Sequence, residues 1–176
     1  MTSDKHYTTK FDSRVGELTL VATDSGLRAV LWPIEKAGRV SLPAELTTSS
    51  DHPVLLAASV QLDEYFRGER KMFDLPLDLR GTEFQKLAWR ALAEIPYGET
   101  VTYGEQAERI GRPKAVRAIG AANGRNPISI VLPCHRVVGA SGDLTGFAGG
   151  IETKRDLLAF ENVQASGHLQ GVLELS

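Results

Sequence analysis

The hydrophobic pattern of the chain changes its period near Arg80. Before this point apolar residues alternate with polar ones in short runs such as Leu18, Leu20 and Ala22, and after it they recur every three or four residues. Alternation is typical of β-strands, and the longer period is typical of helices. The sequence therefore predicts an α+β protein. We expect a strand-rich domain over residues 1–80, a helix-rich domain over residues 81–165 and a tail over residues 166–176.

The first domain contains signals for one hairpin and one helix. Two apolar runs, 18–22 and 27–31, flank a turn at Asp24-Ser25-Gly26, which predicts a β-hairpin. Residues 34–52 predict a loop or a weak strand, and residues 71–79 predict one more strand. Asp51 is the candidate N-cap of a helix that stops at Gly68. The positions expected on one face of this helix are Leu55, Leu56, Ser59, Leu62 and Phe66.

The second domain opens with the clearest helix in the chain. Thr82 and Gln85 have the spacing of a capping box, in which each side chain accepts a hydrogen bond from the other residue's backbone. The apolar stripe that follows ends at Pro96. It comprises Phe84, Leu87, Ala88, Ala91, Leu92 and Ile95.

A second capping box, Thr102 with Glu105, begins a short helix that Gly111 closes. Pro113 suits the first turn of another helix, which is expected to run through Ala122. Two short helices joined by a tight glycine-containing turn predict a helix-turn-helix. Residues 153–162 predict the last helix.

Basic residues cluster at the helix-turn-helix, although the whole chain has a formal net charge of −2. No acidic residue occurs between positions 109 and 136, and the basic residues there are Arg109, Arg112, Lys114, Arg117, Arg125 and Arg136. Cations in this number, facing phosphates, would supply most of the affinity of a non-specific DNA-binding protein. A solvated basic face on a structural helix pair is the alternative. Small residues on the second helix, including Ala115 and Ala118, would allow close approach to a groove.

The chain has one cysteine, Cys134, which excludes an intramolecular disulfide and a cysteine-rich zinc site. A lone cysteine is most often a small buried hydrophobic residue, but this one stands between Pro133 and His135. Adjacent side chains of an extended segment point to opposite sides, so a bridging water would link Cys134 to His135 unless the chain turns between them. A nearby imidazole would increase the thiolate fraction, which is about 3% at pH 7 for a free thiol. The histidine would need an orienting carboxylate, for which several acids could serve.

The segment PCHRVVGASGDLTGFAGG resembles the active-site segment of the O6-alkylguanine-DNA alkyltransferases. GTEFQKLAWRALAEIPYGETVTYGEQAERIG, PKAVRAIGAANGRNP and the closing Lys-Arg-x-Leu-Leu-x-x-Glu are similar to that family in order and spacing, over residues 80–161. The first 80 residues resemble its N-terminal domain loosely. The resemblance implies a ribonuclease-H-like first domain, with an antiparallel sheet and a helix. A mainly helical domain would follow, carrying the helix-turn-helix and the reactive cysteine.

The resemblance also implies roles for single residues. Cys134 would accept the alkyl group, His135 would be the water-mediated base, and Glu161 would be the carboxylate behind it. Asn126 would brace the turn before the active-site segment, and Tyr103 would crowd the target phosphate and protonate the departing guanine. Arg117 would enter the base stack, and further DNA contacts would come from Ala115, Ala118, Arg125 and Arg136. The substrate pocket would be lined by Val137, Phe147, Ala148 and Asn126, with the loop 141–148 offering backbone groups.

Phe147 departs from the family, many of whose members have a tyrosine here. The ring can still stack on a base, but the hydroxyl that would polarise the lesion is missing, and backbone amides with Tyr103 would have to replace it. No metal and no cofactor is expected, because neither a metal cluster nor a nucleotide-binding motif is visible. The absence of a signal peptide or a long apolar segment predicts a cytoplasmic protein that does not enter membranes.

The implied function is direct-reversal DNA repair. The protein would flip O6-alkylguanine, and also O4-alkylthymine, out of double-stranded DNA and move the alkyl group irreversibly to Cys134, once per molecule. We expect a monomer, with clustering along DNA left open. There are three alternatives. The resemblance also allows a non-catalytic sensor of alkylated DNA, against which the presence of Cys134 argues. The residues allow a cysteine hydrolase that uses Cys134 and His135, and a helix-turn-helix regulator in which the thiol is irrelevant.

Overall fold

A computed structural model describes residues 4–165, so the expected tail at residues 166–176 lies outside the described part. The chain divides into two compact units, one formed by residues up to Arg80 together with Pro127–Ser129, the other by Gly81–Asn126 and the residues from Ile130 onward. The first unit thus ends where the hydrophobic period changes. A short piece of the later sequence, Pro127–Ser129, nevertheless belongs to it.

The first unit is built on a four-stranded sheet in the order β3-β2-β1-β4. Its strands are β1 (Tyr7–Ser13), β2 (Gly16–Thr23), β3 (Gly26–Leu31) and the two-residue β4 (Thr47–Thr48). The expected hairpin is present as the antiparallel pair β2 and β3, and β1 pairs antiparallel with β2 through Phe11 and Leu18 among others. The sequence pattern did not reveal β1, and β4 is the weak strand expected within residues 34–52.

Gly26 makes the hairpin turn possible and also accommodates a second chain segment. Its φ of +155° suits glycine, and a Cβ there would lie 2.7 Å from the carbonyl of Pro76. The approach is so close because the Leu27 amide donates to the Pro76 carbonyl at 2.8 Å and the Asp78 amide donates to the Leu27 carbonyl at 2.8 Å. Residues 71–79, expected to form a strand, contribute only an isolated parallel bridge between Leu77 and Leu27.

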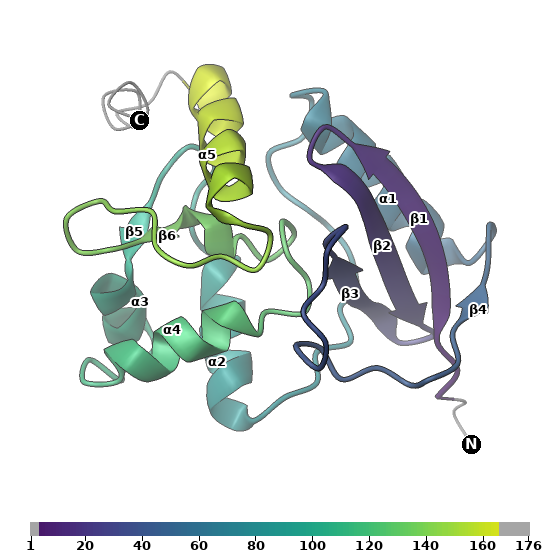
Figure 1. Cartoon of the computed structure of the whole chain (residues 1–176), viewed down its shortest axis with the longest axis horizontal. Coiled ribbons are helices and arrows are strands. Elements are labelled where there is room, and N and C mark those ends of the chain that lie inside the picture. Colours follow the sequence, from purple (N-terminus) through teal and green to yellow (C-terminus); the bar gives the residue numbers. More distant parts are fainter. Residues whose placement is uncertain (1–3, 166–176) are drawn as a thin grey trace. The chain divides into compact units, whose positions relative to one another are not determined.

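Helix α1 (Pro53–Phe66) packs against β1, β2 and β3 (Figure 1). Its N-cap is His52 rather than Asp51, because Pro53 occupies the first helical position and the His52 ring accepts the Val54 amide proton. The buried face also differs from the expected one. Leu55 and Leu62 are buried as expected, but Ala58 and Tyr65 join them, whereas Leu56 is 49% exposed.

The second unit contains the expected helices in the expected order. They are α2 (Glu83–Leu92), α3 (Tyr103–Arg109), α4 (Val116–Gly124) and α5 (Ile151–Ala165), with a short parallel pair formed by β5 (Val101–Thr102) and β6 (Val137–Val138). Both capping boxes are formed. Helix α4 begins at Val116, three residues after Pro113, because residues 112–115 form the turn instead.

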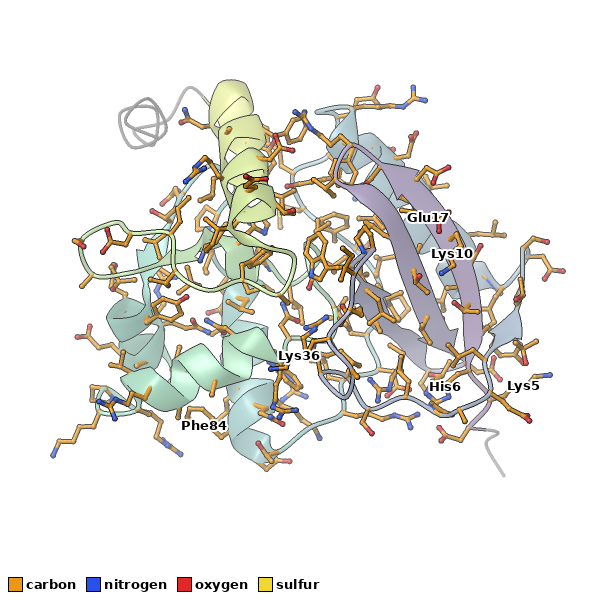
Figure 2. All side chains as sticks on the ribbon, viewed as in Figure 1. Lys5, His6, Lys10, Glu17, Lys36 and Phe84 are labelled. Carbon is orange, nitrogen blue, oxygen red and sulfur yellow. The ribbon has the colours of Figure 1, made fainter. Side chains whose placement is uncertain are left out.

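Small side chains hold α2, α3 and α4 together. The buried cluster contains Ala88 from α2, Ala107 from α3, and Ile119 and Ala122 from α4. Phe84, labelled in Figure 2, packs against its edge. Trp89 is buried as expected for a core residue and donates its indole N–H to the Ala122 carbonyl at 2.8 Å. These contacts hold α3 and α4 together as a helix-turn-helix.

Candidate active site and DNA-binding face

The cysteine lies in a 3₁₀ turn formed by Cys134–Arg136, directly before β6. The turn begins where the Cys134 amide donates to the Leu132 carbonyl at 2.8 Å. The same carbonyl accepts a hydrogen bond from the Asn126 side-chain amide at 2.8 Å, and Asn126 is fully buried. The chain therefore turns between Cys134 and His135, and Asn126 braces the turn from the end of α4.

His135 is fully buried and faces Glu161, which α5 contributes from 26 positions later in the chain. The His135 Nε2 and Glu161 Oε2 atoms are 2.7 Å apart. Because an ionised carboxylate accepts hydrogen bonds, this contact places the ring proton on Nε2 and leaves Nδ1 with a lone pair. Within residues 4–165, no side chain or backbone group bonds to Nδ1. Nδ1 is therefore the ring nitrogen that can act as a base.

Arg136 binds the same carboxylate from the other side. Its Nε donates to Glu161 Oε1 at 2.8 Å, its Nη2 donates to Glu161 Oε2 at 3.1 Å, and its Nη1 donates to the Ile95 carbonyl at 2.7 Å. The guanidinium also lies 5.5 Å from the centre of the Tyr97 ring. Arg136 is 5% exposed. The expectation that it contacts DNA is therefore wrong, because its guanidinium is buried and bound to Glu161 and Ile95.

The charges of this cluster follow from burial and from Arg136. Burial lowers the pKa of His135 below its usual value, although Glu161 acts in the opposite direction. Burial by itself would raise the pKa of Glu161, but His135 and Arg136 outweigh it and hold that pKa well below its usual range. Since His135 is neutral near pH 7, the permanent cation that keeps Glu161 ionised is Arg136. The result is a neutral, oriented imidazole beside the only thiol of the chain.

A second group of site residues gathers around the loop between β6 and α5. Tyr103, the first residue of α3, lies with its hydroxyl 2.9 Å from Thr145 Oγ1. Lys154 of α5 donates to the Thr145 carbonyl at 3.2 Å. The Lys154 ammonium also lies 5.9 Å from the ring centre of Tyr103 and 5.9 Å from that of Phe147. Val137 is fully buried in β6, where it pairs with Val101, and Ala148 is exposed.

Sequence reasoning assigned no role to Lys154, and it did not single out Thr145 within the loop 141–148. Lys154 is 1% exposed, and burial lowers its pKa from 10.5 to about 8. The sequence did contain a pattern that places Lys154 on the buried face of α5. Lys154 and Glu161 are seven positions apart with Leu157 and Leu158 between them, and this spacing puts all four residues on one face of a helix. Thr145 had no such signal, because it lies in a loop whose path local sequence does not specify.

The basic window forms an exposed surface on α3, the turn and α4. The side chains exposed there are Arg109, Arg112, Lys114, Arg117 and Arg125. Ala118 is exposed on α4, whereas Ala115 is half-buried at its N-cap. Without Arg136, five cations remain for contact with phosphates. Positive charge next to small exposed residues on a helix is an arrangement that suits a nucleic-acid groove.

Among residues 4–165, no helix has both the length and the apolar character that crossing a membrane requires. In the same part of the chain, no three His, Cys, Asp or Glu side chains come together in a way that could hold a metal ion.

Two family descriptions match the chain. Residues 6–79 match the ribonuclease-like domain of 6-O-methylguanine DNA methyltransferase, and residues 83–163 match the DNA-binding domain of the same family. The two matches meet at the boundary between the strand-rich and helix-rich parts.

Relatives of high identity cover nearly the whole chain. The methylated-DNA–protein-cysteine methyltransferase of Mycobacterium bovis is 49% identical over 93% of this chain and 96% of its own length. The protein of the same name from Methanosarcina acetivorans is 49% identical over 86% of this chain and 95% of its own length. The crystal structure of Mycobacterium tuberculosis OGT in complex with DNA superimposes with a TM-score of 0.80 at 48% identity, covering 91% and 94% of the two chains.

The buried Cys134 turn with its His135–Glu161–Arg136 cluster, the basic helix-turn-helix and these similarities agree with one another. The chain belongs to the 6-O-methylguanine DNA methyltransferase family, and it is a DNA-binding methyltransferase whose acceptor is a protein cysteine.

Proposed function

We propose that this protein repairs DNA by moving an alkyl group from the O6 atom of guanine, and from the O4 atom of thymine, to the sulfur of Cys134. The observation that carries the proposal is the buried His135 ring, bound through Nε2 to Glu161 at 2.7 Å, in the same turn as the thiol. A neutral imidazole with a free Nδ1 lone pair beside a thiol is suited to accept the thiol proton.

The reaction is a displacement at the alkyl carbon. The proton of Cys134 passes through a water to Nδ1 of His135, and a sulfur lone pair forms the new S–C bond. The C–O6 bond breaks, and its electron pair stays with guanine, which is protonated by Tyr103 as it leaves. The protonated His135 then gives its proton to the Tyr103 phenolate, so both side chains return to their starting forms and the thiol proton has in effect passed to guanine. The product is a thioether, which water does not hydrolyse, so each molecule acts once.

The target nucleotide has to leave the duplex before the thiol can reach it. Extrusion costs a few kcal/mol of unpairing and unstacking. Arg117 is exposed on α4, and in this proposal its side chain would fill the space left in the base stack. Four further exposed cations, Arg109, Arg112, Lys114 and Arg125, would bind the phosphates. Alkylated duplex DNA is therefore the partner that we propose, bound by a monomer.

Phe147 and Tyr103 would hold the extruded base. The centre of each ring lies 5.9 Å from the Lys154 ammonium, so both rings lie near the same charged group. Base–aromatic stacking contributes about 1 to 3 kcal/mol per base. Because Phe147 lacks a hydroxyl, Tyr103 and backbone amides of the loop 141–148 would have to polarise the alkylated oxygen of the lesion.

Intact-mass spectrometry tests the proposal directly. After the protein is mixed with a duplex that contains O6-methylguanine, it should gain one methyl group, located on Cys134, in an amount that saturates at one per molecule. The matched variant Cys134→Ser should gain none. A cysteine hydrolase would turn over beyond one equivalent, and a sensor would bind without any gain in mass. A regulator would keep its DNA binding and remain unmodified, so each of these outcomes would contradict the proposal.

A further inference from the structure

The loop between β6 and α5 is rich in glycine, and its two ends are fixed in different ways. Its first part closes on itself, since the Gly139 amide donates to the Asp143 carbonyl at 2.8 Å and Ser141 Oγ donates to Asp143 Oδ2 at 2.6 Å. Leu144 then packs against Val138 and Leu158. The last part leads into α5, with the Gly150 amide bound to the Phe147 carbonyl at 2.9 Å.

Thr145 ties the middle of this loop to two helices. Its hydroxyl lies 2.9 Å from the Tyr103 hydroxyl at the start of α3, and its carbonyl accepts a hydrogen bond from Lys154 of α5 at 3.2 Å. Both partners are themselves anchored. Tyr103 packs against the cluster that joins α2, α3 and α4, and Lys154 is 1% exposed.

The hydrogen bonds of Thr145 to Tyr103 and Lys154, which we call the tether, matter because the next residue is Gly146. A Cβ on Gly146 would meet no atom within 4 Å, so the space that a side chain would fill next to Thr145 is open. A glycine backbone has more conformational freedom than that of any other residue. Phe147 follows immediately, so its ring is held in place by the tether at Thr145 on one side and by the turn to Gly150 on the other.

We propose that Thr145 is a specificity-determining residue of the alkyl-transfer site, which it controls by position rather than by touching the reacting atoms. By binding Tyr103 and Lys154 at once, it fixes the loop and sets the gap between the Tyr103 and Phe147 rings. That gap limits the size of the alkyl group that enters with the base. The inference rests on the alkyl transfer proposed above and adds what decides its selectivity.

Two substitutions separate the hydroxyl of Thr145 from its shape. Thr145→Val keeps the branched side chain and removes the hydrogen bond to Tyr103, whereas Thr145→Ser keeps the hydroxyl and removes a methyl group. Single-turnover rate constants are measured with two duplexes of the same sequence, one with O6-methylguanine and one with O6-benzylguanine. Phosphate contacts are the same in both duplexes, so they cancel in the ratio of the benzyl rate to the methyl rate.

Thr145→Val should raise the benzyl-to-methyl ratio about two- to tenfold, the range that corresponds to losing one neutral hydrogen bond. Thr145→Ser should keep the ratio of the parent protein. Two results would overturn the inference. Equal ratios in all three proteins would mean that Thr145 has no role in selectivity, and equal changes of the ratio in both variants would mean that the hydroxyl of Thr145 is not what matters.

A second substitution guards against a folding defect in the valine variant. Tyr103→Phe removes the same hydrogen bond from the other side. It also removes the proposed proton donor and so should lower both rate constants, but the ratio should move in the same direction as in Thr145→Val, and adding Thr145→Val should change the ratio no further. An additive change would contradict the tether. The proposed function fails separately: if the parent protein gains no alkyl group from either duplex, alkyl transfer itself is wrong, whereas transfer with an unchanged ratio contradicts only the role of Thr145.

Discussion

His135 Nε2 lies 2.7 Å from Glu161 Oε2, and the same carboxylate also binds the buried guanidinium of Arg136. The Glu161 carboxylate thus orients the His135 imidazole and also balances the buried charge of Arg136. Removing its charge should affect both catalysis and folding, because the two tasks depend on the same oxygen atoms.

Glu161→Gln should slow methyl transfer at least tenfold, since the amide cannot stabilise the imidazolium that forms when His135 takes the thiol proton. It should also lower the free energy of unfolding by about 3 to 5 kcal/mol, the usual cost of leaving a buried charge unpaired. Single-turnover rates and urea unfolding measure the two effects. The control is Glu152→Gln, an exposed position on the same helix. Adding Arg136→Met should restore part of the stability but not the rate; recovery of the rate would contradict the role of Glu161.

Cys134→Ala should abolish transfer while leaving DNA affinity nearly unchanged, because the sulfur supplies the bond-forming electrons and little of the phosphate contact.

Five basic side chains are exposed around the helix-turn-helix. If all five neutralised phosphates, the logarithm of the affinity would fall with the logarithm of salt concentration with a slope of up to about 4.5. Fluorescence anisotropy over a salt series measures this slope, and a flat response would show that the DNA lies elsewhere.

Arg117→Ala should slow repair of duplex DNA far more than reaction with free O6-benzylguanine, because a free base needs no extrusion from a duplex. Arg109→Ala is the matched control on α3. It removes an exposed cation and should weaken DNA binding without a specific loss of rate at saturating DNA. Equal losses by Arg117→Ala on the duplex and on the free base would instead indicate damage to the site.

Phe147→Tyr should leave DNA binding alone and either raise the transfer rate two- to tenfold or leave it unchanged, since one neutral hydrogen bond contributes about 0.5 to 1.5 kcal/mol. Phe147→Ala should reduce transfer by a larger factor, because it removes a stacking surface worth about 1 to 3 kcal/mol. Single-turnover rates decide the matter. A rate for Phe147→Ala equal to that of the parent would mean that residue 147 does not contact the base.

Lys154 should make stability depend on pH in the alkaline range. Burial lowers its pKa from 10.5 to about 8, so between these values the unfolded chain binds more protons than the folded one. Stability from this group therefore rises as pH increases from about 8 towards 10.5. Lys154→Met should remove this rise and be more stable than the parent at pH 7, by at most about 3 kcal/mol. Chemical unfolding at several pH values tests it, with the exposed Lys114→Met as control; an unchanged pH profile in Lys154→Met would show that burial does not perturb this lysine.

The sequence by itself determined the features that depend on neighbours within a few residues. Both capping boxes formed as expected, because the bonding partners are three residues apart and need no help from the rest of the fold. The hairpin of β2 and β3 formed for the same reason, through a turn that Gly26 permits. At α1 the expected N-cap, Asp51, was wrong, because Pro53 occupies the first helical position and His52 is therefore the N-cap.

The cluster of His135, Glu161 and Arg136 was predicted in part by the residues and in part by the family resemblance. Local sequence left several acids open as partners of His135, and the family resemblance implied Glu161, which the structure places at hydrogen-bond distance. Arg136 was assigned to the basic window because its neighbours in sequence are basic. The tertiary structure instead turned it inward, where Glu161 and the Ile95 carbonyl bind it.

Only the tertiary structure decided which distant residues meet. Strand β1 has a weak pattern of its own and exists because β2 pairs with it along its whole length. Lys154 and Thr145 make their contacts because α5 and the glycine-rich loop lie beside Tyr103. Capping and turn formation involve short-range hydrogen bonds that the local sequence specifies, whereas burial of a charge or docking of a loop depends on contacts between segments far apart in the chain, and these exist only once the unit has folded.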